Sequence, residues 1–237
     1  MSDTPLFDRV LAGAAPGARL LDVGCGAGDL LAAAAAAGLT VSGVEVDRRP
    51  LSLAEQAAPG ADLRIGDAHE LPFADDAFDL VTLVQVLEHV TNPVVALREA
   101  SRVTAPGGSV RVSVWGAPEE CDASVIGASL APLTGAEPRP QRGDGAPPLT
   151  DPDRLTKLTE LAGLTVRGIE VVRVPVDHED EDDLVAGVLA SAPGRHAARA
   201  AGPGAVREAV LKGLEPFRHG TGFRLTDTVR VLDAAPA

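Results

Sequence analysis

The sequence predicts an α/β protein built on a doubly wound parallel sheet. Two observations support this fold class. Short apolar runs alternate with helix-forming segments from residue 19 to residue 114, and a glycine-rich turn ends the first apolar run and leads directly into a helix. Strands separated by helices pair in parallel, because each helix carries the chain back to the start of the next strand. A length of 237 residues suits one such domain with an elaborated second half.

In the first half of the chain, local sequence patterns predict each strand and helix. We expect a short leading helix at residues 6–14 and strands at 19–23, 39–46, 62–65, 78–84 and 109–114. Gly38 ends the helix that follows the glycine turn, and Pro50 opens the next helix. Asn92 and Pro93 have the capping pattern of a helix that runs to Arg102. The run at 78–84 is almost wholly apolar, which is typical of a strand covered on both faces.

The second half is less regular. Residues 116–152 contain seven prolines and five glycines with little periodicity, which predicts an irregular segment. Asp151 and Pro152 restart a helix that ends near Gly163, and a strand is expected at 165–174. A mostly helical insertion at 176–222 precedes a final strand at 223–232. We predict a single domain over 1–237, with its core at 18–115 and variable segments at 116–150 and 176–222.

The composition excludes several classes of protein. A net charge of -13 argues against nucleic-acid binding, which needs clustered lysine and arginine. No apolar run approaches the roughly 20 residues of a membrane span, and no signal-peptide pattern opens the chain. Two cysteines, Cys25 and Cys121, cannot build a disulfide framework or a cysteine zinc site. We therefore expect a soluble cytoplasmic protein; the sequence does not define its oligomeric state.

The turn after the first strand is the most informative segment. It reads Asp22-Val23-Gly24-Cys25-Gly26-Ala27-Gly28, with glycines at alternate positions. Glycine allows a sharp turn and a close ligand, and the following helix directs free amides at that ligand. The dinucleotide fingerprint needs a third glycine one position later, where this chain has Asp29, a poor neighbour for a pyrophosphate. The turn predicts a nucleotide-like ligand without phosphates.

Polar residues follow the other predicted strands at the edge where such ligands bind. Glu45 closes the second strand, 17 residues after Gly28, near the roughly 20-residue spacing of an acid that binds ribose hydroxyls. Asp67 and Ala68 follow the third strand, where a carboxylate can accept from an adenine amine and a small residue leaves room for the ring. Val84 and Gln85 end the fourth strand and can close the pocket.

In order and spacing, these segments resemble the motifs of class I S-adenosylmethionine-dependent methyltransferases. The segments that carry the resemblance are 22–28, 43–47, 66–73, 78–81 with 87–90, and 99–103 with 106–108. The resemblance implies a Rossmann-like, seven-stranded sheet with an antiparallel last strand, and S-adenosylmethionine as cofactor. The branch it is most similar to methylates small molecules, as in quinone biosynthesis and natural-product tailoring.

The resemblance also implies roles for single residues. Gly24 and Gly26 would lie under the methionine portion, Glu45 would bind the ribose diol, and Asp67 would bind the adenine amine. The full predicted cofactor-binding set is Asp22, Gly24, Cys25, Gly26, Gly28, Glu45, Val46, Asp67, Ala68, Val84, Gln85 and His89. Two positions depart from the family pattern: Glu45 stands where Asp is common, and Asp29 occupies a position that is commonly uncharged.

Methyl transfer from a sulfonium is an in-line displacement that mainly needs positioning and exclusion of water. A hydroxyl acceptor also needs a base, for which His89 and then His219 are candidates. A role for His89 at the start of a helix, or behind the residues that contact the ligands, is at least as compatible with the sequence. The variable segments would bind the small-molecule acceptor as a lid, and no metal site is expected. Two rivals stay open: a cofactor-binding partner or regulator without catalysis, and an NAD-dependent oxidoreductase.

Several residues have simpler interpretations that we prefer. Cys25 is expected as a buried filler of the turn rather than a nucleophile, His69 as a surface residue, and Trp115 as core rather than a substrate platform. Asp47 is expected to open a helix rather than touch the ribose.

Two charged features have structural interpretations as well. The acidic run at 177–183 is expected to open a helix rather than bind a cation. Glu99 and Arg102 are spaced to pair on one helix face, at the surface or as a brace for the next turn.

Overall fold

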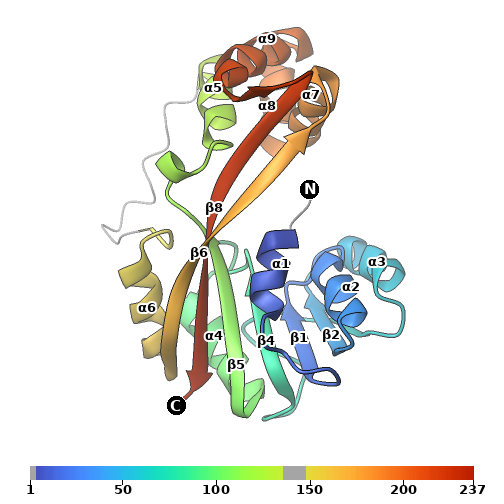
Figure 1. Ribbon diagram of the computed structural model, residues 1–237, viewed down its shortest axis with the longest axis vertical. Coiled ribbons are helices and arrows are strands. Elements are labelled where there is room, and N and C mark those ends of the chain that lie inside the picture. Colours follow the sequence, from blue (N-terminus) through green and yellow to red (C-terminus); the bar gives the residue numbers. More distant parts are fainter. Residues whose placement is uncertain (1–3, 136–147) are drawn as a thin grey trace. The chain divides into compact units, whose positions relative to one another are not determined.

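The computed structural model describes residues 4–135 and 148–237 and divides the chain into two compact units (Figure 1). The sheet unit comprises residues 4–115, 149–172 and 229–237. The described part of the helical unit comprises residues 116–135, 148 and 173–228. In these described residues, no helix is both long enough and apolar enough to cross a bilayer.

The sheet has the predicted topology. Its strands follow the order β3-β2-β1-β4-β5-β8-β6. The bounds are β1 Arg19–Val23, β2 Thr40–Glu45, β3 Asp62–Ile65, β4 Phe78–Val84, β5 Thr104–Trp115, β6 Leu164–His178 and β8 Gly222–Pro236. The first five pair in parallel, and β8 pairs antiparallel to β5. This confirms a mostly parallel sheet whose last strand is antiparallel.

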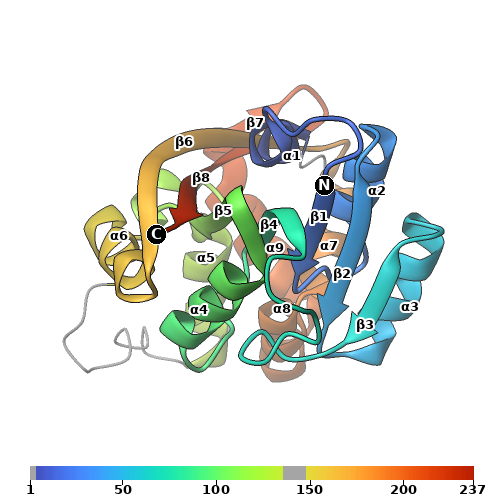
Figure 2. The same cartoon turned by 90° about the horizontal axis from the view of Figure 1, so that it is seen from below.

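Helices cover both faces of the sheet (Figure 2). They are α1 Thr4–Leu11, α2 Asp29–Ala36, α3 Arg48–Ala57, α4 Pro93–Val103 and α6 Pro152–Leu161. Leu21 and Val81 are buried with residues of α4 and α6, whereas Leu20 and Leu80 are buried with residues of α2 and α3. Successive residues of a strand point to opposite faces, so two cores form from the same strands. These cores hold the loops at the strand ends in place.

Helix caps were predictable from local sequence, with one error. The Asn92 side chain accepts from Val95 N, and Asp151 caps α6 in the same way. Asp47 is the N-cap of α3, as expected, and accepts from Arg49 N at 2.9 Å. Pro50 does not open α3, because the helix already begins at Arg48. The capping carboxylate of Asp47, three residues before Pro50, accepts from the first turn of the helix before the proline is reached.

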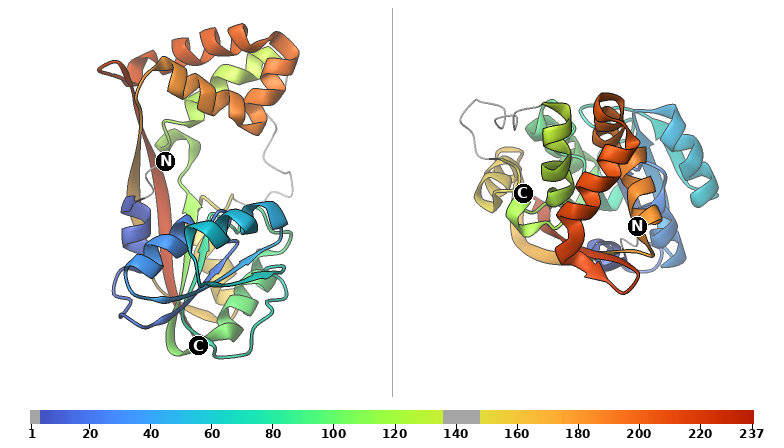
Figure 3. Two further views of the ribbon diagram at one scale, coloured as in Figure 1. Left: turned by 90° about the vertical axis from the view of Figure 1, so that its right-hand side faces the viewer. Right: turned by 90° about the horizontal axis from the view of Figure 1, so that it is seen from above.

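The helical unit contains α5 Ser124–Thr134, α7 Glu181–Ala190, α8 Ala192–Ala201 and α9 Pro203–Leu214 (Figure 3). Short 3₁₀ turns lie at Pro118–Glu120 and Glu215–Phe217, and β7 Arg218–His219 forms a hairpin with β8. Its core is built from the following buried residues: Leu130, Leu184, Val206, Val210, Leu214, Phe223 and Leu225. The expected helical insertion is confirmed from Glu181 onward, while residues 176–178 belong to β6.

Several expectations need correction. Helix α1 begins and ends earlier than expected, β5 begins at Thr104 and not at residue 109, and β8 continues to Pro236. Helix α5 lies in a segment expected to be irregular; Val125, Ile126 and Leu130 pack into the core of the helical unit, a contact that no local pattern shows. Residues 136–147 of that segment lie outside the described residues. Strand β6 is longer than expected at both ends. Trp115 is 39% exposed rather than buried in the core.

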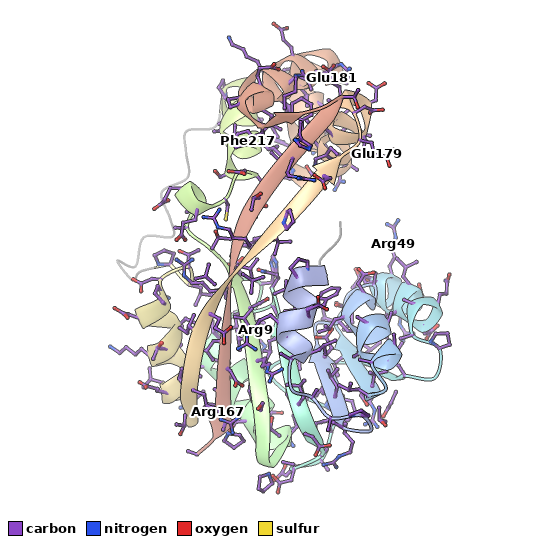
Figure 4. All side chains as sticks on the ribbon, viewed as in Figure 1. Arg9, Arg49, Arg167, Glu179, Glu181 and Phe217 are labelled. Atoms are coloured by element: carbon purple, nitrogen blue, oxygen red, sulfur yellow. The ribbon has the colours of Figure 1, made fainter. Side chains whose placement is uncertain are left out.

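The acidic run opens a helix, as expected. Asp180 is the N-cap of α7 and accepts from Asp183 N at 2.8 Å. Glu181, labelled in Figure 4, pairs with Arg207 and Arg218 at 3.1 and 3.0 Å. Acids at a helix N-terminus are favoured by the helix dipole, and the arginines balance their charge.

Candidate functional site

A pocket of about 420 Å³ lies in the sheet unit at the carboxyl ends of its parallel strands. Its walls come from the segments that follow β1, β2, β3 and β4. The lining residues are Gly24, Val44, Glu45, Val46, Gly66, Asp67, Ala68, His69, Val84, Gln85, Val86, His89, Val90 and Thr91. This is the position at which doubly wound sheets bind ligands.

The glycine turn is fixed to the neighbouring strand. The amides of Gly24 and Cys25 both donate to Val44 O, at 2.7 and 3.0 Å. Gly24 has a φ of 72°, and a Cβ there would lie 2.6 Å from Val86 Cγ2. Gly28 has a φ of 88°, and a Cβ there would lie 2.8 Å from Ala54 Cα on α3. Gly24 therefore shapes the pocket wall, whereas Gly28 allows α2 to approach α3.

Glu45 joins the glycine turn to the start of α3. Its Oε2 accepts from Gly26 N at 3.0 Å, and its Oε1 accepts from Asp47 N at 3.1 Å. Each carboxylate oxygen has a second lone pair, so the side chain keeps acceptor capacity for hydroxyl donors in the pocket. The carboxylate is oriented before any ligand arrives.

Asp22 and Cys25 are buried beside the pocket and do not line it. Thr82 Oγ1 donates to Asp22 Oδ1 at 2.7 Å. Burial raises the pKa of Asp22 to about 7; the charge of Glu45 adds to the shift, and the Thr82 bond opposes it. Burial likewise raises the pKa of the Cys25 thiol to about 12. Cys25 is thus the buried filler expected from the sequence, and a thiol with this pKa is a poor nucleophile at neutral pH.

Asp67 and His69 form a pair on the third wall. Asp67 Oδ1 accepts from His69 N at 2.9 Å and lies 2.5 Å from His69 Nδ1. His69 Nε2 lies 3.1 Å from Asn92 N and 3.3 Å from Thr91 Oγ1. The expectation of a surface role for His69 was wrong, because its ring is half-buried and links two elements of the pocket.

Two arginines brace the loop that continues from this pair. Arg102 donates to Leu71 O at 3.1 Å and to Phe73 O at 2.9 Å. Glu99 pairs with Arg102 at 2.7 Å, as expected, and accepts from Leu71 N at 2.8 Å. The pair therefore braces the 71–73 loop and not the turn that follows its own helix. Arg64 also donates to this loop, and its guanidinium lies 4.2 Å from the centroid of the Phe73 ring.

Gln85 has the features of a residue that binds a polar ligand. It has a φ of 57°, a left-handed conformation that costs on the order of 1–3 kcal/mol for a residue with a side chain. Its Nε2 and Oε1 atoms are buried at the pocket, and no described residue hydrogen-bonds to either. Buried amides are rarely left without partners, so a polar ligand fits here.

The two histidines proposed as bases lie in different surroundings. His89 lines the pocket and is exposed, and its backbone N donates to Val86 O at 2.9 Å. Burial raises the pKa of the adjacent Glu88 carboxyl, and a bond from the Trp115 amide opposes this shift. His219 is an exposed residue of β7 in the helical unit and does not line the pocket. Its role as a base stays a prediction, as does that of His89.

The described residues contain no group of three His, Cys, Asp or Glu side chains arranged to hold a metal ion. Eight predicted cofactor residues line the pocket: Gly24, Glu45, Val46, Asp67, Ala68, Val84, Gln85 and His89. The other four, Asp22, Cys25, Gly26 and Gly28, belong to the glycine turn but do not line the pocket.

Comparison with known proteins agrees with this geometry. The family described as "Methyltransferase domain" matches residues 21–112. A demethylmenaquinone methyltransferase from Renibacterium salmoninarum is 42% identical over 106 residues, which are 45% of this chain and 45% of the relative. The chain therefore matches less than half the length of that relative. A ubiquinone biosynthesis O-methyltransferase from Pseudomonas fluorescens is 32% identical over 162 residues, which are 65% of this chain and 67% of the relative.

The chain belongs to the S-adenosylmethionine-dependent methyltransferases. S-adenosylmethionine is the cofactor that goes with this family. Among solved structures, the cyclase SpnF has the same fold, with a TM-score of 0.61 and 23% identity over 98% of this methyltransferase and 80% of that chain. The fold by itself therefore does not define the reaction.

Sequence reasoning missed six lining residues of this methyltransferase: Val44, Gly66, His69, Val86, Val90 and Thr91. Gly66 and Val86 lie just past strand ends, so the strand-end rule could have found them. Val90 and Thr91 precede the capped helix α4 and carry no local signal, because only the turn after β4 brings them to the pocket.

Proposed function

We propose that this chain transfers a methyl group from S-adenosylmethionine to a small-molecule acceptor. The observation that carries the proposal is one pocket that holds a pre-oriented carboxylate, Glu45, and a buried side-chain amide, Gln85, to which no described residue hydrogen-bonds. Family membership supports the cofactor, and the names of the relatives support a small acceptor. The activity of the whole protein stays a proposal because the first relatives match this chain over less than half their length.

The residues present fit the cofactor. Glu45 would accept hydrogen bonds from the ribose hydroxyls, and Asp67 would accept from the adenine amine. The small Ala68 side chain leaves space beside Asp67 for a ring. Gln85 and the backbone at Gly24 would contact the methionine portion, which carries both donors and acceptors. All of these residues line the same pocket, which supports the assignments.

The chemistry needs little from the protein beyond placement. Bound S-adenosylmethionine supplies an electrophilic methyl group on a positively charged sulfur. The pocket residues fix the direction of the donor, which an in-line attack requires, and exclude water from the path. For a hydroxyl acceptor, His89, which lines the pocket and is exposed, would take the released proton.

We propose an acceptor of the quinone-precursor class, because the first relatives are named for menaquinone and ubiquinone biosynthesis. The choice of acceptor would depend on the segments 116–150 and 176–222, which lie outside the match to the family. The composition supports an apolar or polyhydroxylated acceptor: without tyrosine and with 3% aromatic residues, an aromatic cage for a cation is disfavoured.

Calorimetric titration with S-adenosylmethionine, its demethylated product and NAD tests the cofactor. We expect binding of the first two and no response to NAD. Binding of NAD alone would refute the proposal in favour of an oxidoreductase. Transfer of labelled methyl groups across a panel of hydroxylated quinone precursors tests catalysis. Cofactor binding without transfer to any acceptor would favour a regulatory protein.

A further inference from the structure

The His69 ring joins the loop after β3 to the start of α4. One ring nitrogen, Nδ1, lies 2.5 Å from Asp67 Oδ1. The other, Nε2, lies 3.1 Å from the backbone nitrogen of Asn92, the N-cap residue of α4. Thr91 Oγ1 lies 3.3 Å from the same Nε2 atom. A single side chain therefore spans two walls of the pocket.

The partners of the ring determine which nitrogen carries the proton. The Asn92 amide can only donate, so Nε2 accepts and carries no hydrogen. In the neutral ring the hydrogen is then on Nδ1, which donates to Asp67 Oδ1. The start of α4 thereby sets the tautomer that the Asp67 carboxylate needs.

This arrangement leaves one carboxylate oxygen of Asp67, Oδ2, in a defined position to accept a hydrogen bond from a ligand. Its Oδ1 receives two bonds from His69, one from the backbone N and one from the ring. Its Oδ2 receives no bond from any residue that the structure describes. The two His69 bonds lower the pKa of Asp67. The Asp67 side chain is therefore an ionised carboxylate, which accepts hydrogen bonds and has no proton to donate. The Asp67 side chain is 62% exposed, and without the ring it would sample several rotamers.

A fixed carboxylate distinguishes an amine from an oxo group. An exocyclic amine donates to Oδ2, whereas an oxo group at the same place puts two acceptors against each other. A site built to hydrogen-bond one group discriminates against an analogue that lacks it. A carboxylate free to rotate would turn away from the oxo group, and the discrimination would be lost.

We propose that His69 is a positioning residue that holds Asp67 as a selective acceptor for the adenine amine of the cofactor. The inference rests on the proposed function, because it assumes that adenine occupies this wall. It concerns selectivity for the base and assigns His69 no contact with the reacting atoms.

The test compares S-adenosylhomocysteine with S-inosylhomocysteine, in which oxygen replaces the adenine amine. Dissociation constants are measured by calorimetry for the wild type and three variants. His69→Asn keeps an amide donor near the position of Nδ1, and His69→Gln keeps an acceptor near the position of Nε2. His69→Ala removes both. All three keep the backbone donor to Asp67.

We expect the wild type to prefer the amine by about 50-fold, the value of one hydrogen bond to a charged group. The preference should fall below about 5-fold in His69→Ala and His69→Gln and stay within about 3-fold of wild type in His69→Asn. Equal loss of affinity for both ligands, with the preference retained in His69→Ala and His69→Gln, would overturn the inference and leave the proposed function intact. Failure of the wild type to bind either ligand would overturn both.

A second measurement needs no ligand and no substitution. Nitrogen-15 NMR of the histidine rings reports which nitrogen of His69 is protonated. We expect the Nδ1–H form. The Nε2–H form would contradict the assigned bonds to Asn92 and Asp67, and the inference would fall.

Discussion

Replacing Glu45 by alanine should weaken cofactor binding at least tenfold. The carboxylate is held by the amides of Gly26 and Asp47, at 3.0 and 3.1 Å, so it faces the pocket without reorganisation. Two ribose hydroxyls would donate to it. At about 1 kcal/mol for each bond at this half-exposed site, their loss amounts to about 2 kcal/mol, or roughly 30-fold in the dissociation constant.

The assay is calorimetric titration with S-adenosylhomocysteine. Glu45→Gln should show a smaller loss, because its amide oxygen still accepts one bond. Glu55→Ala, which removes the same charge from an exposed position on α3, is the matched control and should bind like wild type. An unchanged dissociation constant in Glu45→Ala would show that this carboxylate does not bind the ribose.

Three further predictions concern stability and reactivity. Arg102→Ala should lower the free energy of unfolding by about 1–2 kcal/mol, because it breaks the bonds to the 71–73 loop. Denaturant titration measures this change, with Lys157→Ala as an exposed control. Equal stability of the two variants would contradict the prediction. Burial raises the pKa of Asp22 from 3.8 to about 7, so the folded protein holds a proton that the unfolded chain releases between these values; stability should fall as pH rises from about 4 to about 7. This Asp22-dependent decline should be absent in Asp22→Asn, and identical pH profiles for the two proteins would refute the assignment. Burial raises the pKa of the Cys25 thiol to about 12, so Cys25 should resist alkylation in the native state and react after unfolding. Mass spectrometry of the peptides measures the extent of alkylation in each state. Rapid alkylation of the native protein would contradict the buried role.

The sequence by itself determined the doubly wound fold class, the positions of the first strands along the chain and the residues at their carboxyl ends. The bounds of β1, β3 and β4 agree with the predicted runs. For β1 and β4 the reason is that buried parallel strands need largely apolar segments, whereas β3 is mostly exposed. The caps at Asp47 and Asn92 depend only on a side chain and the amides two or three residues away. Glu45 and Asp67 were found because carboxyl ends of parallel strands share one edge of a sheet.

Only the tertiary structure decided what depends on contacts between distant segments. Helix α5 is stabilised by packing against other helices and not by its own sequence, which contains Pro132 near its end. His69 acquired its two partners because the loop after β3 and the start of α4 meet, although 22 residues or more separate them in the chain. Local patterns record propensities and caps, whereas the partner of a polar side chain depends on which segments folding brings together.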